Sequence, residues 1–389
     1  MSVEVPLAWK NLIHDRRKLM VALAGIAFAV MLMFQQRGFN HALFDSTVEI
    51  VRQLDGDIIL INPARFALSN EIRFPRGAID IAASHPEVLA AEPLYIENVA
   101  ARLRREGRRA RPIRVLAFDL DKTLFLDADD SISSQLPALR EPNTAIMDRL
   151  SKRSYGFDLS SSATLPQSGE LSGHRLNIIG FFQSGRDFAH EGNLIMSLEN
   201  FVQYFGYRAL DPRDVVDLGV IKLRDDSNAD TVVASLQNAI GGNVRVMTRQ
   251  QLIDKEIDFW ARNTPIGVIF TIGALMGFVV GVIICYQILA NDISEHMGEF
   301  ATLKAMGYRN PYFFGLVIRQ AIYLAIMGFI PGLVLSWLLF QFNSSMTGLL
   351  MHLTLPRIIT ILVATILMCV VSGLLALRKL LAADPASLF

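Results

Sequence analysis

Four long apolar stretches divide the chain, and they are spaced very unevenly. The first runs without a charged residue from Leu19 to Gln36. The other three, at Asn263–Asn291, Gln320–Phe340 and Ile358–Leu377, follow one another closely near the carboxyl terminus. A helix needs about 20 apolar residues to cross roughly 30 Å of hydrocarbon. The pattern therefore predicts one transmembrane helix, a long polar segment, and then three more transmembrane helices.

These stretches indicate an α-helical membrane protein with four transmembrane helices and a large α+β extracytoplasmic domain inserted between helices 1 and 2. The expected segments, in chain order, are a cytoplasmic amphipathic lead-in helix (1–18), the first transmembrane helix (19–36), a periplasmic domain with stalk helices (37–262), the second transmembrane helix (263–290), a cytoplasmic loop (291–311), the third transmembrane helix (312–341), a short periplasmic loop (342–357), the fourth transmembrane helix (358–377) and a cytoplasmic tail (378–389).

The positions of the charges, rather than their sum, orient these helices. Hydrophobic residues make up 52% of the chain and charged residues 19%, and the formal net charge is +0. The basic residues that flank the outermost spans are Lys10, Arg16, Arg17 and Lys18 before the first span, and Arg378 and Lys379 after the last. Because basic residues favour the cytoplasmic side, we expect a multi-pass protein of the cell inner membrane. Both of its termini would be cytoplasmic and its large domain periplasmic.

A cleaved signal peptide is the main alternative for the first span, since it would also combine a basic start with an apolar core. The core ends in Met31–Gln36, however, which contains no small-x-small cleavage site. Both cysteines, Cys285 and Cys369, fall inside apolar stretches. The large domain is therefore expected to fold without a disulfide.

Periodic patterns predict a β-α-β unit, similar to those of porter domains, close to the second transmembrane helix. Its strands are expected at Val215–Arg224 and Val244–Met247, with a helix at Thr231–Ile240 between them. Asn228 or Asp230 is expected to cap this helix.

Residues 131–196 predict a second, β-rich lobe of the large domain. Two further segments, His41–Leu54 and Gln250–Trp260, are apolar at helical spacing. They adjoin the first and second transmembrane helices, and we expect them to extend those helices beyond the membrane as a stalk.

Two short motifs suggest chemistry but lack the framework for it. Asp119-Leu120-Asp121-Lys122-Thr123 resembles the nucleophile motif of haloacid-dehalogenase phosphatases, but the alternating strands and helices of a doubly wound sheet are not predicted around it. Leu171–Arg175 is similar to the signature motif of ATP-binding cassettes, although the chain has no G-x-x-x-x-G-K-[ST] loop. We therefore assign no catalytic residue and no metal ligand, and we keep a membrane-anchored phosphatase as a minor alternative.

Seven arginines gather on one predicted hairpin, at positions 102, 104, 105, 108, 109, 111 and 114. A solvated hairpin face is the expected interpretation, and binding of a partner or of an anionic lipid headgroup is the alternative.

Small residues recur at four-residue spacing in two of the predicted spans. Gly273, Gly277 and Gly281 form such a stripe in the second span, and Gly25 and Ala29 form a shorter one in the first. Small residues at this spacing let helix backbones approach closely in a membrane. The stripe predicts either packing within one chain or the seam of a homodimer.

The cytoplasmic loop 291–311, called the coupling loop below, predicts a short amphipathic helix. Glu299, Leu303 and Met306 recur at helical spacing, Phe300 and Lys304 lie one position further on, and Gly307 is placed to end the helix. A helix that rests on lipid is one interpretation. The other is a helix that docks in a groove of a partner protein.

The same loop carries a family resemblance. Glu299-Phe300-Ala301-Thr302-Leu303-Lys304-Ala305-Met306-Gly307 resembles the R-E-x-A-x-L-[KR]-A-[LM]-G segment of the MacB/FtsX superfamily of permeases. Ala8–Leu12 and Asp384–Leu388 are similar to the lead-in helix and the D-P-x-x-x-L tail of that superfamily. The run from Pro6 to Pro63 looks most like the DevC branch. One departure is Gly298, where the superfamily often has a basic residue.

The resemblance implies the membrane subunit of an ABC exporter that works as a homodimer with a separate ABC ATPase. ATP and Mg²⁺ would be bound by that ATPase, and this chain would bind no cofactor and no nucleic acid. The implied partners are a membrane-fusion (adaptor) protein, a TolC-like outer-membrane channel and membrane lipid, and the DevC branch implies an envelope glycolipid as substrate. The residues expected to contact the ATPase are Glu295, Glu299, Phe300, Leu303, Lys304, Met306 and Gly307. An FtsX-like regulator of a cell-wall hydrolase and a lipoprotein-releasing permease are the alternatives within the superfamily.

Overall fold

The computed structural model describes residues 16–122, 124–126, 131–185, 187, 190–225, 227–347 and 353–382. The expected lead-in helix, up to residue 15, and the tail motif Asp384–Leu388 lie outside these residues. The chain forms two compact units. We call them the helical unit (1–41, 265–346 and 351–389) and the mixed α/β unit (42–264 and 347–350).

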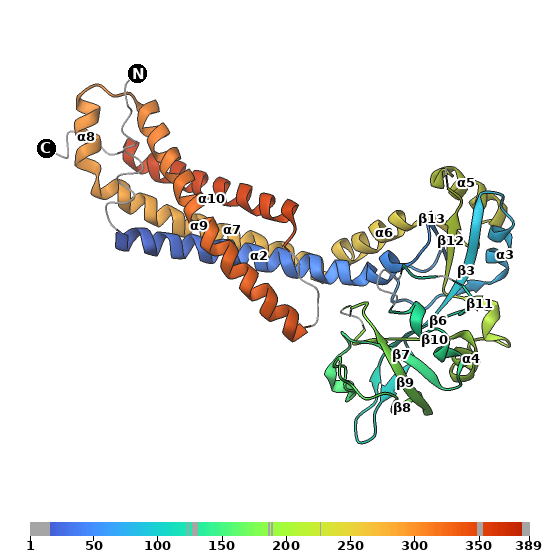
Figure 1. Cartoon of the computed structure of the whole chain (residues 1–389). Coiled ribbons are helices and arrows are strands. Elements are labelled where there is room, and N and C mark those ends of the chain that lie inside the picture. The colour runs from blue at the N-terminus through green and yellow to red at the C-terminus, as the bar shows by residue number, and fades with distance from the viewer. Residues whose placement is uncertain are drawn as a thin grey trace. The chain divides into compact units, whose positions relative to one another are not determined.

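The helical unit is made of long apolar helices that run side by side (Figure 1). Its helices are the first part of α2 (Arg16–Gln53), α7 (Pro265–Glu295), α8 (Met297–Ala305), α9 (Asn310–Thr347) and α10 (Leu355–Ala382). Four of them, α2, α7, α9 and α10, are long and apolar enough to cross a membrane. The short helix α8 lies at one end of the group (Figure 1).

Aromatic and small side chains hold these helices together. The rings of Phe34 in α2 and Phe329 in α9 have centroids 5.9 Å apart. The Ser372 hydroxyl of α10 donates a hydrogen bond to the carbonyl oxygen of Val282 in α7, at 2.9 Å. Cys285 and Cys369 are both buried and both free thiols.

The mixed α/β unit is built on one long sheet. Its eleven strands among the described residues lie in the order β13-β1-β12-β3-β6-β10-β7-β9-β8-β4-β5. Their bounds are β1 (Ile58–Ile61), β3 (Val88–Glu97), β4 (Arg102–Arg104), β5 (Arg111–Pro112), β6 (Arg114–Phe118), β7 (Thr144–Asp148), β8 (Gln167–Leu171), β9 (His174–Phe182), β10 (Asn193–Ser197), β12 (Leu218–Leu223) and β13 (Arg245–Thr248). A separate pair joins β2 (Phe74–Pro75) to β11 (Val215–Val216).

Helices and short 3₁₀ turns complete this unit. The α-helices are α3 (Gly77–Ala83), α4 (Leu198–Tyr204), α5 (Ala229–Ile240) and α6 (Arg249–Arg262). The 3₁₀ turns are η1 (Ser133–Gln135), η2 (Ala138–Arg140), η3 (Arg153–Tyr155), η4 (Gly206–Arg208) and η5 (Pro212–Asp214).

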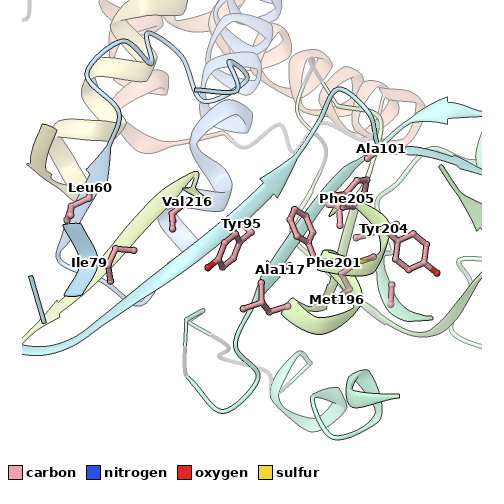
Figure 2. Packing of buried hydrophobic residues seen from close by; sticks show 14 of the residues in the cluster. Leu60, Ile79, Tyr95, Ala101, Ala117, Met196, Phe201, Tyr204, Phe205 and Val216 are labelled. Carbon is pink, nitrogen blue, oxygen red and sulfur yellow. The ribbon is translucent and has the colours of Figure 1, made fainter. Parts of the chain in front are cut away.

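Alternation along the strands gives the sheet two apolar faces and therefore two cores. In β1, Ile58 and Leu60 belong to the core that α3, α4 and α5 cover. The neighbouring residues Ile59 and Ile61 belong to the core that α6 and the end of α2 cover. Figure 2 shows part of the first core, where the rings of Phe201 and Phe205 have centroids 4.9 Å apart. A sheet covered on both faces explains why all four residues of β1 are buried.

The predicted β-α-β unit is present in a split form. Strands β12 and β13 both pair antiparallel with β1, which lies between them, and α5 connects them. The Asn228 side chain caps α5 by accepting hydrogen bonds from the backbone N–H groups of Asp230 and Thr231. Gly241, with φ of +85°, ends the helix in a conformation that glycine adopts without strain.

The prediction of a separate β-rich lobe at 131–196 is wrong in one respect. The strands expected there are present as β7 to β10, but they continue the main sheet instead of forming their own. Strand β10 pairs parallel with β6, and β7 pairs with β10. Because the open edge of β6 carries unpaired backbone groups, a neighbouring strand satisfies them.

The two stalk predictions have different outcomes. Helix α2 runs on without a break to Gln53, as expected. Helix α6, in contrast, ends at Arg262, and a new helix starts at Pro265, so the second extension is not continuous. Proline disfavours the helical conformation of the residue before it and lacks an N–H group, which explains the break.

Candidate coupling site

The predicted helix of the coupling loop is present as α8, and its end has a defined geometry. Gly307 follows it with φ of +92°. The Tyr308 N–H donates a hydrogen bond to the Leu303 carbonyl oxygen at 3.2 Å, which is the six-residue closure of a Schellman motif. A side chain at position 307 would strain this backbone conformation. Gly307 therefore fixes where the chain leaves α8.

The residues expected to contact the ATPase are not all presented alike. Glu299 on α8 and Met306 in the turn after it are exposed, with 64% of Met306 accessible, whereas Leu303 is half-buried. Phe300 and Lys304 lie on α8 by their backbone positions. Glu295 is the last residue of α7, and its carboxylate forms an ion pair with Lys18 of α2 at 2.5 Å. Among the residues whose exposure is described, Glu299 and Met306 are thus open, and Glu295 is exposed but paired with Lys18.

A second polar contact ties α7 to α9 near the same place. The Gln320 side chain donates a hydrogen bond to the Asp292 carboxylate at 3.1 Å. Lys18, Asp292 and Gln320 were absent from the residues predicted for this site. The signal in the sequence was weak but present, because Asp292 and Glu295 are acids that directly follow the apolar part of α7.

The glycine stripe of α7 is used within the chain. A Cβ atom added at Gly273 would lie 2.6 Å from the side-chain amide carbon of Gln36, and one added at Gly281 would lie 2.9 Å from the Ala29 Cβ. At Gly277 the added atom would lie 3.4 Å from Met33. The face that these three glycines share is therefore covered by α2 of the same chain.

Gly25 completes this seam from the other side, since a Cβ there would lie 2.6 Å from Ile284 of α7. Of the two interpretations of the stripe, packing within one chain is the one that the contacts describe. A homodimer seam remains a prediction for the surfaces that this packing leaves open.

The motifs that suggested other chemistry have local roles. The Asp119 carboxylate accepts a hydrogen bond from the Asp121 N–H at 3.0 Å, and Asp121 forms an ion pair with Arg140. Ser172 and Gly173, with φ of +50° and +91°, form the turn between β8 and β9. Among the described residues, no group of three or more His, Cys, Asp or Glu side chains is placed to hold a metal ion.

Several arginines of the predicted hairpin face pair with acids of the same unit. Arg104 lies 2.6 Å from the Glu170 carboxylate and Arg111 lies 2.9 Å from that of Glu191. Arg114 is buried and lies 2.6 Å from Asp187. These ion pairs neutralise part of the positive charge that would otherwise be available to bind a partner or an anionic lipid headgroup.

The carboxyl-terminal part of the chain matches a known family. Residues 271–385 match the family model described as the FtsX-like permease C-terminal domain. This stretch contains most of α7 and all of α8, α9 and α10. This stretch is therefore similar to FtsX-like permease domains, and the match supports the resemblance to the MacB/FtsX superfamily. Among curated proteins, no sequence matches the chain.

Two solved structures are similar to about half of the chain. One is the periplasmic region of MacB from Actinobacillus actinomycetemcomitans, with 11% identity, a TM-score of 0.35, and coverage of 52% of this chain and 94% of that chain. The other is the extracellular domain of the noncanonic ABC-type transporter YknZ from Gram-positive bacteria, with 11% identity, a TM-score of 0.32, and coverage of 49% and 98%.

Proposed function

We propose that the chain is the permease subunit of a MacB-like ABC exporter, driven by a separate ATPase. The match of residues 271–385 to the FtsX-like permease domain supports this function, as do the four helices that are long enough to span a membrane. The observation that carries the proposal is α8, a short helix between α7 and α9 with exposed Glu299 and a glycine-defined end. Such a helix suits docking in a groove of a partner.

In this proposal α8 is the helix through which ATP binding and hydrolysis by the ATPase act on this chain. Phe300 and Leu303 provide the apolar anchor, and Glu299 and Lys304 set the register against charges on the ATPase. ATP and Mg²⁺ stay on the ATPase. Movement of the ATPase displaces α8, and α7 and α9, which flank α8 in the chain, transmit the displacement.

The finer parts of the proposal follow the DevC branch. The protein acts as a homodimer in the cell inner membrane, with both termini in the cytoplasm and the mixed α/β unit in the periplasm. That unit works with a membrane-fusion (adaptor) protein and a TolC-like channel, and an envelope glycolipid is the proposed substrate. Identifying the proteins that co-purify with the chain from its own cells tests these assignments together.

A double variant, Glu299→Lys with Phe300→Ala, tests the coupling site. Reversing one charge and removing one apolar anchor should weaken capture of the ATPase by about tenfold or more. Membrane insertion should be unchanged, because both substituted residues lie outside the four helices that are long enough to span a membrane. The measurement is affinity capture of the full chain, with the ATPase identified by its nucleotide-binding sequence, followed by ATPase turnover in proteoliposomes.

The chain offers a matched control in α6, where Asp258 and Phe259 are also an adjacent acid and aromatic residue. The variant Asp258→Lys with Phe259→Ala should keep normal capture and turnover. If the α8 variant retains full binding and stimulation, the coupling assignment is wrong. If ATPase activity is normal in the wild type but no substrate is exported while a cell-wall hydrolase is activated, the FtsX-like regulator replaces the exporter.

A further inference from the structure

One cavity in the helical unit combines polar and apolar walls. Its volume is about 660 Å³, and residues of α2, α7, α8 and α9 line it. This size falls in the range of small-molecule sites, roughly 300–1,000 Å³. The cavity adjoins the Lys18–Glu295 ion pair, since both of these residues line it.

The two kinds of wall lie on successive turns of the same helices. In α2, Arg17 and Lys18 are followed by Leu19 and Ala22. In α7 the order is reversed, because the apolar Leu289 comes before the acids Asp292 and Glu295. The charged ends of both helices therefore meet at one end of the cavity, and the apolar side chains continue from there along the helices. A ligand that fits must have a polar head and an apolar body.

The charges of the polar wall constrain the head. Three carboxylates, from Asp292, Glu295 and Glu299, line the cavity together with the cations Arg17 and Lys18. The acids outnumber these two cations, and the His296 imidazole, which also lines the cavity, lies 3.7 Å from Asp292, so a head with net negative charge is disfavoured. A head with both an ammonium and a phosphate group satisfies both kinds of side chain.

A buried acceptor lies next to this wall. Gln320 is fully buried, and its amide nitrogen donates to Asp292 at 3.1 Å. Its amide oxygen has no hydrogen-bond partner. An unsatisfied buried acceptor costs free energy unless a donor reaches it. Gln320 does not line the cavity, so its role here is to hold the Asp292 carboxylate in position and not to contact a ligand.

We propose that this cavity binds a phospholipid whose head carries a primary ammonium, as in phosphatidylethanolamine. The ammonium lies among Asp292, Glu295 and Glu299, and the phosphate lies toward Arg17 and Lys18. The acyl chains begin along Leu19, Ala22 and Leu289. A choline head fits less well, because its quaternary ammonium has no N–H to donate. This site goes beyond the proposed function, although it shares Glu295 and Glu299 with the predicted ATPase contact, and it is tested on the chain without any ATPase.

The test measures which lipids stay bound to the purified full chain. The protein is placed in nanodiscs with equal parts of phosphatidylethanolamine, phosphatidylglycerol and phosphatidylcholine, transferred to mild detergent, and analysed by native mass spectrometry. The wild type should retain phosphatidylethanolamine about tenfold over the other two lipids, the discrimination that one charge-assisted hydrogen bond gives. Equal retention of the three lipids, or preference for phosphatidylglycerol, overturns the proposal.

Two variants that remove opposite charges sharpen the result. Glu295→Gln lowers the negative charge of the wall and removes the carboxylate that lies 2.5 Å from Lys18, so the preference should shift toward phosphatidylglycerol. Lys18→Gln should reduce retention of all phosphate-bearing heads and create no preference for phosphatidylglycerol. The matched control is Asp258→Asn, an exposed acid of α6 outside the cavity, which should bind lipids as the wild type does. If Glu295→Gln keeps the wild-type preference, the assignment of the ammonium site is wrong.

A soluble competitor shows whether the ligand of the cavity is a lipid or a small soluble amine. Glycerophosphoethanolamine has the same head without acyl chains, and it should displace the bound lipid only at concentrations about a hundredfold higher, because it cannot use the apolar wall. Displacement at equal concentration would show that the site recognises a soluble amine and would overturn the lipid assignment. Size-exclusion profiles of each variant verify folding, and a gain of phosphatidylglycerol binding in Glu295→Gln cannot come from a loss of structure.

Discussion

The two units differ in the kind of polar side chain that they bury. Among the described residues, every buried charged side chain lies in the mixed α/β unit, and the buried polar side chains of the helical unit are uncharged. In water the hydrophobic effect provides a large driving force for burial, which can offset the cost of enclosing charges. Helices in lipid lack that driving force and depend on close packing instead.

In the mixed α/β unit the largest buried charge cluster joins three chain segments. Arg208 forms an ion pair with Asp217, and both side chains are fully buried. Arg65 donates a hydrogen bond to the Asp217 carbonyl oxygen at 2.9 Å, and the Asp217 carboxylate accepts another from the Ile96 N–H at 2.8 Å. Burial lowers the pKa of Arg65 below its usual value, although Asp217 opposes the shift.

In the helical unit the buried hydroxyls bond to their own helices. Ser336, Thr365 and Ser372 each donate a hydrogen bond to the carbonyl oxygen four residues earlier, at 2.6 to 2.8 Å. Ser336 and Thr365 are satisfied without a partner on another helix, whereas the Ser372 hydroxyl also lies 2.9 Å from the Val282 carbonyl oxygen of α7. The difference indicates that loss of one polar group should damage the mixed α/β unit far more than the helical unit.

The largest effect is therefore expected at Asp217. The variant Asp217→Ala leaves Arg65 and Arg208 buried without their main acid, which should destabilise the mixed α/β unit by about 3–5 kcal/mol. Thr365→Val in the helical unit removes one buried hydroxyl and should cost less than about 1.5 kcal/mol. Hydrogen exchange of β12 and of α10 in the full chain measures the two effects separately. Equal effects would remove the contrast between the units.

A smaller effect is expected from acid. Burial alone would raise the pKa of Asp187, but Arg114 and the hydrogen bonds from His190 outweigh it and lower the pKa to about 2, against an ordinary value of 3.8. The charged form thus favours the folded state. Its contribution, about 2 kcal/mol, is complete above about pH 4 and is lost as the pH falls toward 2.

Hydrogen exchange of β6 and β10 between pH 5 and pH 2 measures this loss, with Asp187→Asn as the control that cannot titrate at this position. Burial raises the pKa of the neighbouring Asp148. Protonation of Asp148 in acid therefore favours the folded state, whereas protonation of Asp187 disfavours it. The difference between wild type and Asp187→Asn cancels the contribution of Asp148. A profile identical for both proteins would contradict the assigned role of Asp187.

The smallest effect tests the seam between α2 and α7. A methyl group at Gly281 would lie 2.9 Å from the Ala29 Cβ and would overlap the Met368 sulfur, whereas one at Gly277 would make ordinary contact with Met33. Gly281→Ala should therefore cost about 1–2 kcal/mol, the low end for overpacking because one methyl is added. Gly277→Ala should be neutral within about 0.5 kcal/mol.

Thermal unfolding of detergent-solubilised protein compares the two variants. If Gly277→Ala were the worse of the two, the seam would have a different register. The same experiment bears on the homodimer. A change in oligomeric state in the Gly277→Ala variant would indicate that the glycine stripe of α7 lies in the dimer interface.

Features that depend on neighbouring residues were predictable from the sequence. The apolar stretches gave the long helices, Asn228 and Gly241 gave the ends of α5, and Gly307 gave the end of α8. Pro265 was also a readable signal for the break between α6 and α7, although the apolar spacing on both sides favoured one continuous helix. In each case the deciding interaction lies within about one helical turn.

Features that join distant parts of the chain were not predictable. Strand β10 joins β6 only because the fold brings together residues about 80 positions apart. The ion pair of Lys18 and Glu295 joins residues separated by 277 positions. The cavity beside that pair is lined by residues of four helices, and two of its acids, Glu295 and Glu299, were predicted to contact a partner because the sequence of the loop shows only neighbouring residues.

The arrangement of β1 and β13 has a consequence for how the protein can be altered. Strand β1 follows α2 directly, β13 directly precedes α6, and the two strands are paired, with Ile58 opposite Thr248. The chain therefore enters and leaves the sheet through adjacent strands. Domains with neighbouring ends are tolerated as insertions in another protein. The paired ends of β1 and β13 are accordingly the place where the mixed α/β unit can be joined to or removed from another chain with the least disturbance of the sheet.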